Sequence, residues 1–196
     1  MTNFPGTESG IRNKMIEELY TFCVEVAQDM VASDANEVRP FLALAWESKE
    51  SKGAIGEVSL MDAAMFHETE DGIGKDALMG FINGLVSGDS EILAMVGGQE
   101  GRHRTMEPLL VGHVVEAWSV SRPLRDGKQA PSLPQGQSVS DQIDRAEVVL
   151  VQVHARGRTV QASCPLVMAE SGRKVMVVVP IDLEAEFSGR LVVRPE

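Results

Sequence analysis

The sequence predicts an α+β fold in which two amphipathic helices pack on a mostly antiparallel sheet of about seven or eight strands. Residues 147–179 hold three runs rich in β-branched residues, and short glycine turns separate them, which is the pattern of consecutive hairpins. Two other segments, one near the N-terminus and one in the middle of the chain, have apolar residues at spacings of three and four. Such spacing is typical of helices that bury one face.

The first helix is expected over residues 9–32, where apolar residues form a single stripe. Its members are Ile11, Met15, Leu19, Phe22, Cys23, Val26 and Met30. Strands are expected at residues 41–47 and 57–61, and the polar loop between them predicts a hairpin. Because Pro40 cannot donate to a ladder, we expect this end to lie at the start or the edge of the sheet.

A second helix is expected over residues 75–87, with Gly88 as its C-terminal cap. Gly80 and Gly84 lie four apart in it, which favours close packing against a sheet over a chemical role. Further strands are expected at residues 91–96, 109–121, 147–155, 158–168 and 174–179, with a last short one at 191–193.

Residues 122–146 are rich in Pro, Gly, Ser and Gln and have no periodicity, so they predict a flexible loop. At 196 residues the chain has the length of one domain, and we expect residues 1–196 to form a single unit around one core.

The net charge of −11 is unevenly distributed. Residues 1–100 carry 6 Lys and Arg against 18 Asp and Glu, whereas residues 101–196 carry 12 against 11. An acidic half repels phosphate, so no nucleic acid or anionic membrane surface is expected as a partner. With no apolar stretch of membrane-spanning length, no signal-like N-terminus and two cysteines far apart in sequence, we expect a cytosolic protein with free thiols.

Motifs that would indicate a metal, a cofactor or catalysis are missing. We expect no metal and no cofactor, and the sequence favours a protein without catalytic activity while leaving an enzyme open. Residues 72–75 (GIGK) resemble a phosphate-binding loop, but Asp76 stands where that loop needs Ser or Thr. The acidic residues from 68 to 76 lack the order of a calcium loop. His113 and His154 are the weak catalytic candidates, because the two could meet if their strands pair.

A short pattern runs through the second half of the chain: Glu116-Ala117-Trp118, then Pro131-Ser132, then Asp144-Arg145-Ala146-Glu147 before an apolar strand. It resembles the E-A-W…P-S…P-D-R-x-E pattern of uncharacterised bacterial proteins over roughly residues 110–165. This chain departs from the pattern in having Ile143 in place of a Pro and a longer insert before Asp144. The resemblance implies a bacterial protein and carries no activity.

The same residues have a direct physical interpretation. Trp118 shares a strand face with Glu116, and Arg145 is expected to pair with Glu116 from a neighbouring strand. Asp144 is expected to cap a turn and Glu147 to begin a strand. We therefore expect these five residues to form a ligand or partner surface.

Two functions are consistent with these observations. The first is a non-catalytic interaction or accessory protein that self-associates, because a β-rich half leaves strand edges to cover. The alternative is a small-molecule-binding protein or an enzyme, with a site near Glu116 and Trp118 under the 122–146 loop.

Overall fold

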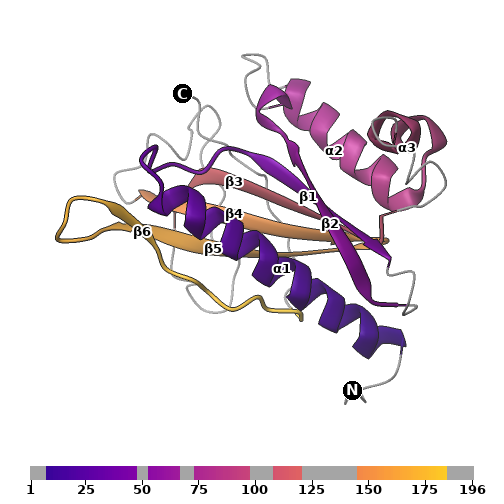
Figure 1. Ribbon diagram of the computed structural model, residues 1–196, viewed down its shortest axis with the longest axis horizontal. Helices are drawn as coiled ribbons and strands as arrows, with labels where there is room; N and C mark the ends of the chain where they lie inside the picture. Colours follow the sequence, from indigo (N-terminus) through magenta and orange to yellow (C-terminus); the bar gives the residue numbers. More distant parts are fainter. Residues whose placement is uncertain (1–7, 48–52, 67–72, 98–107, 121–144, 185–196) are drawn as a thin grey trace, which may run out of the picture.

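The computed structural model describes residues 8–47, 53–66, 73–97, 108–120 and 145–184. Six antiparallel strands form one curled sheet in the order β2-β1-β3-β4-β5-β6 (Figure 1). The helices are α1 (Glu8–Ala32), α2 (Ile73–Ser87) and α3 (Ser90–Gly97), with a 3₁₀ turn at Ala64–Phe66. The strands are β1 (Phe41–Glu47), β2 (Ile55–Asp62), β3 (Leu110–Val120), β4 (Arg145–Ala155), β5 (Arg158–Met168) and β6 (Lys174–Met176).

The α+β class is confirmed, while the described residues hold three helices and six strands rather than two helices and seven or eight strands. Two expected strands account for the difference. Residues 91–96 are helical, and the strand expected at 191–193 lies outside the described residues, as does most of the 122–146 loop.

Helix α3 forms because Asp89 caps it. The Asp89 carboxylate accepts from the amides of Glu91 at 2.9 Å and Ile92 at 3.2 Å, which satisfies two of the free donors at a helix start. Gly88, with φ 79°, ends α2 immediately before this cap. A six-residue apolar run does not distinguish strand from helix, and the capping residue beside it decides for the helix.

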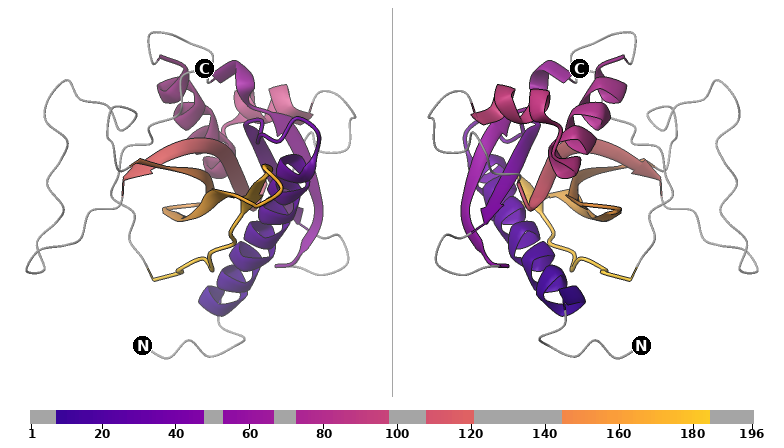
Figure 2. Two further views of the ribbon diagram at one scale, coloured as in Figure 1. Left: turned by 90° about the vertical axis from the view of Figure 1, so that its left-hand side faces the viewer. Right: turned by 90° about the vertical axis from the view of Figure 1, so that its right-hand side faces the viewer.

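Helices cover both faces of the sheet (Figure 2). Helix α1 packs on one face, where it buries the larger core with β1, β3, β4 and β5. Helices α2 and α3 lie on the other face, over a cluster that includes Leu42, Leu44, Trp46 and Val111. We call the two sides the α1 face and the α2 face.

The buried stripe of α1 is rotated from the predicted one. Ile11 is 43% exposed, and Phe22, Val26 and Met30 are only partly buried. The residues that are buried are Met15, Ile16, Leu19, Tyr20, Cys23, Val24, Ala27 and Val31. Apolar residues on this helix span more than one stripe, so spacing alone does not decide which stripe meets the sheet.

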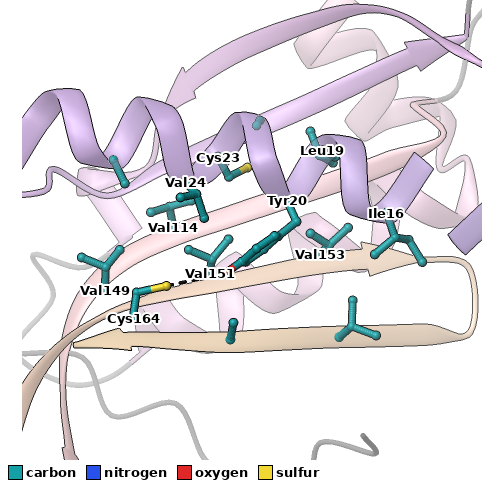
Figure 3. Close-up of a cluster of buried hydrophobic side chains, with 14 of the residues drawn as sticks. Ile16, Leu19, Tyr20, Cys23, Val24, Val114, Val149, Val151, Val153 and Cys164 are labelled. Carbon is teal, nitrogen blue, oxygen red and sulfur yellow. Dashed lines mark hydrogen bonds between the residues drawn. The ribbon is translucent and has the colours of Figure 1, made fainter. Parts of the chain in front are cut away.

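The chain after β6 runs along α1 without forming a longer strand. The Tyr20 hydroxyl donates to the carbonyl of Val179 and lies 3.6 Å from the Cys164 sulfur (Figure 3). Arg158 binds the Leu183 carbonyl and, at 2.8 Å, the Asn13 side chain. These contacts hold the chain after Met176 in place, and β6 ends at Met176 rather than at the predicted residue 179.

Two glycines allow close approach. A Cβ on Gly112 would lie 2.5 Å from the Cys23 sulfur and 3.3 Å from the Ala43 Cβ, so β3 can approach α1 only because this side chain is missing. A Cβ on Gly84 would lie 2.2 Å from the Ile92 Cδ1, whereas Gly80 faces open space. The close packing expected of the glycine pair thus falls to Gly84 alone, and its partner is α3 rather than a sheet.

Candidate functional site

Strand alternation divides the candidate residues between the two faces of the sheet. Glu116 lies two positions after Val114, which belongs to the core under α1, so Glu116 is on the α1 face. Glu147 on β4 is on the α1 face as well, as its contact with the same lysine as Glu116 shows. His113 and His154 have the opposite parity and lie on the α2 face. The structure therefore does not bring the histidines and the glutamates to one site.

On the α1 face, a cluster of charged groups joins four parts of the chain. The Lys174 ammonium donates to Glu116 Oε1 at 3.0 Å and to Glu147 Oε1 at 2.9 Å. The second carboxylate oxygen of Glu116 accepts from the Val38 amide at 3.1 Å. These groups, which we call the Lys174 cluster, tie β3, β4 and β6 to the segment that leads into β1.

The environment favours the charged forms of Glu116 and Lys174. Burial raises the pKa of Glu116, but hydrogen bonding with Glu147, Lys174 and the Val38 amide outweighs burial, so the pKa of Glu116 is lowered. Burial lowers the pKa of Lys174, but its contacts with Glu147 and Glu116 outweigh that effect, so the pKa of Lys174 is raised. A carboxylate held by two donors on the edge of the core is a structural contact rather than a free acid or base.

Arg145 and Trp118 lie beside this cluster. The guanidinium carbon of Arg145 is 4.6 Å from the centre of the Trp118 ring, which is a cation–π contact. In the strand register, Glu116 is opposite Val149, which is four residues after Arg145 on β4. The ion pair that Glu116 makes is with Lys174. Thus Lys174, rather than Arg145, supplies the expected ion pair.

On the α2 face, a row of polar side chains crosses three strands. The His113 Nδ1 lies 3.1 Å from the Gln152 Oε1, and the Gln152 Nε2 donates to the Gln161 Oε1 at 3.1 Å. Since an amide oxygen only accepts, the proton of this contact is on Nδ1 of His113. His113 is fully buried and Gln152 nearly so, which makes the row part of the interior and not an open catalytic surface.

His154 lies on the same face, two positions from Gln152 along β4. His154 and His113 lie diagonally across β3 and β4 rather than directly opposite each other. The register pairs His113 with Gln152 and His154 with Val111. Its Nδ1 is 3.1 Å from the Thr159 hydroxyl, and its Nε2 is buried with no hydrogen-bond partner among the described residues. Burial lowers the pKa of His154 to about 4, so the ring is neutral at pH 7.

The low pKa of His154 predicts a pH dependence of stability. The folded protein excludes a proton that the unfolded chain binds near pH 6.5, so this stability is complete above pH 6.5 and is lost as the pH falls toward about 4. The urea midpoint of the protein, followed by circular dichroism, is expected to fall between pH 7 and pH 5. The variant His154→Asn, whose amide can keep the Thr159 contact without titrating, should lose most of this slope; an unchanged slope would assign it to another group.

Across the described ranges, no group of three or more His, Cys, Asp or Glu residues could hold a metal ion. Nor is any helix in that part of the chain both long and apolar enough to cross a membrane. Asp144 lies outside the described residues, so its expected turn cap is untested.

Sequence reasoning missed Lys174, Val38 and Gln152. The sequence offers one weak signal for the role of Lys174, which stands at the start of an apolar strand. A lysine that is partly buried there needs a carboxylate partner. The Val38 amide gives no sequence signal at all. Comparison with protein families, with curated proteins and with solved structures found no match to this chain, so its function is inferred from this geometry.

Proposed function

We propose that this chain is a non-catalytic interaction or accessory protein that self-associates. One observation carries the proposal: five of the nine large apolar side chains exposed among the described residues fall within twelve positions of sequence. They are Val167, Met168, Val175, Val177 and Val178, with exposed fractions between 44% and 64%. Three of them, Val167, Val175 and Val177, lie on the α2 face of the β5–β6 hairpin. Grouped exposed apolar side chains of this kind mark interaction surfaces, whereas isolated ones are ordinary.

The alternative, a small-molecule-binding protein or enzyme with a site near Glu116 and Trp118, has weaker support. Lys174 and the Val38 amide already occupy the Glu116 carboxylate, and Arg145 lies on the Trp118 ring. A ligand there would have to displace these contacts. The two candidate histidines, His113 and His154, lie on the other face of the sheet.

Sedimentation velocity over a wide range of protein concentration tests the proposal. The average mass of the wild-type protein in solution is expected to rise from 21.2 kDa toward twice that value as its concentration increases. Val175→Lys should raise the dissociation constant about tenfold or more, because it buries a charge where the partner offers apolar groups.

The matched control is Met95→Lys, which places the same charge on α3 at a side chain that is 74% exposed. This control should associate as the wild type does, and both variants should keep the wild-type thermal midpoint. A wild-type protein that stays monomeric at every concentration would refute self-association.

A further inference from the structure

We infer that self-association occurs face to face through the β5–β6 hairpin, with a second copy of this chain as the partner and a two-fold axis over the Val167–Val175 pair. This inference rests on the proposed function and names the surface that carries it. The hairpin lies at the end of the sheet away from α2 and α3 (Figure 1).

An apolar row on the α2 face lies next to this pair, two positions away along each side of the hairpin. The register places Ala117 opposite Val148 and Val148 opposite Pro165, and the Val177 amide donates to the Pro165 carbonyl at 2.8 Å. Exposure rises along the row, from 4% at Ala117 and 5% at Val148 to 45% at Val177. The row is therefore interior on β3 and β4 and faces outward at Val177, just after β6.

The two sides of the hairpin differ in burial. Met176 points to the α1 face and is 5% exposed, while Val167 and Val175 are register partners on the α2 face with 44% and 48% of their surface exposed. An antiparallel hairpin that faces water on one side usually carries polar residues there. Valines at both positions indicate that this face is covered by something apolar.

Pairing through the β6 edge is disfavoured because another part of the chain covers that edge. The Lys174 amide donates to the Asn36 side chain at 3.2 Å, and the Arg173 guanidinium donates to the Ser33 carbonyl at 3.1 Å. Asn36 has φ 53°, a left-handed conformation that asparagine tolerates. A loop laid along a strand edge in this way blocks its extension by another strand.

The opposite edge of the sheet is disfavoured by charge. Strand β2 carries Glu57 and Asp62 and no basic residue. Antiparallel pairing of β2 with its own copy would bring four carboxylates together along one short ladder, and like charges across strands are destabilising. The exposed Leu60, at 51%, is the apolar residue that such an interface would use.

Charge also favours a second copy as the occupant of the β5–β6 face. Residues 145–184 hold five Lys and Arg against four Asp and Glu, whereas residues 1–100 have a balance of −12. Two copies that meet here join nearly neutral segments, so this contact lacks the like-charge repulsion that two acidic segments would bring. The exposed valines cover less than the roughly 800 Å² that each partner buries in a stable complex, so the dimer should be weak and concentration-dependent.

Disulfide cross-linking tests this arrangement, because a residue near a two-fold axis lies close to its own copy. Three single-cysteine variants are compared after mild oxidation: Val167→Cys, Val175→Cys and Leu60→Cys. The wild-type chain is the blank, since Cys23 and Cys164 are both buried and free. Val167→Cys and Val175→Cys are expected to give covalent dimers and Leu60→Cys none.

Each other outcome has a distinct meaning. In edge-to-edge pairing of β6, two copies of residue 167 would be three strand spacings apart, about 14 Å, which is too far for a disulfide. Cross-linking of Val175→Cys without Val167→Cys would therefore overturn the face-to-face arrangement, as would cross-linking of Leu60→Cys. A wild type that dimerises while no variant cross-links also overturns it, whereas a wild type that never dimerises refutes the proposed function itself.

Discussion

Replacing Lys174 by Met is expected to lower the free energy of unfolding by about 3 kcal/mol at pH 7, because it removes the ammonium group that two partly buried carboxylates share. Glu116 and Glu147 have 9% and 18% of their side chains exposed, so water compensates only in part. Urea unfolding at pH 7, followed by far-UV circular dichroism, measures the loss.

Lowering the pH should reduce the difference in unfolding free energy between the wild type and Lys174→Met. The lowered pKa of Glu116 gives the wild type stability that is present above the unfolded value of 4.5 and is lost as the pH falls through the lower folded value. In the variant, Glu116 lacks the contact with Lys174 that lowers its pKa, so it takes up a proton more readily. The two proteins should thus approach each other in stability as the pH falls toward 4, and a gap that stays constant would show that lost packing, not charge, causes the effect.

Lys14 offers a matched control. It pairs with Glu18 at 3.5 Å on α1, but its side chain is 78% exposed and that of Glu18 is 46% exposed. Lys14→Met should change the free energy of unfolding by no more than about 0.5 kcal/mol, the usual value of an exposed helix pair. A comparable loss in both variants would contradict a special role for the Lys174 cluster.

Gly112→Ala is expected to destabilise the protein by about 2 kcal/mol, the usual cost of overpacking a core. The added methyl group would lie 2.5 Å from the sulfur of Cys23, which is fully buried, and 3.3 Å from Ala43 on the neighbouring strand. Since β3 is held by β1 and β4 on its two sides, it cannot move away from α1 without breaking ladder bonds.

A double-mutant cycle identifies the cause. Cys23→Ala alone should cost about 1 kcal/mol for the small cavity that it leaves. Combined with Gly112→Ala, it removes the atom that clashes, so the double variant should be less destabilised than the sum of the two single variants. Strictly additive losses would show that the glycine is needed for another reason.

Gly80→Ala is the control for the glycine itself. Nothing lies within 4 Å of a Cβ at this position on α2, so helix propensity alone should act. A gain of up to about 1 kcal/mol is expected. The opposite signs for two Gly→Ala changes would show that the surroundings, not glycine as such, decide the effect.

Only some of the contacts in the candidate site can be predicted from the sequence. Alternation along β3 correctly separates His113 from Glu116, because side chains three apart on a strand point to opposite faces. It also correctly puts Trp118 beside Glu116. The ion pair expected from Arg145 is made by Lys174 instead, which is 58 residues from Glu116 in sequence and reaches it because β6 pairs beside β5.

Local chemistry also explains the helix that was expected to be a strand. Residues 91–96 are apolar enough for either, and Asp89 next to Gly88 is a capping signal that outweighs composition. By contrast, the rotated stripe of α1 has no local cause. Tyr20 and Val24 are buried because the sheet and the segment after β6 meet them there.

By itself, the sequence determined the α+β class, the full extent of the strands 41–47 and 158–168, and the tight turn at Gly157. These depend on backbone preference, side-chain alternation and turn residues, which act over a few positions. Only the tertiary structure decided which stripe of α1 is buried, which cation meets Glu116 and which valines remain outside. Those outcomes depend on segments distant in sequence that pack against one another, and local preferences do not specify the partner.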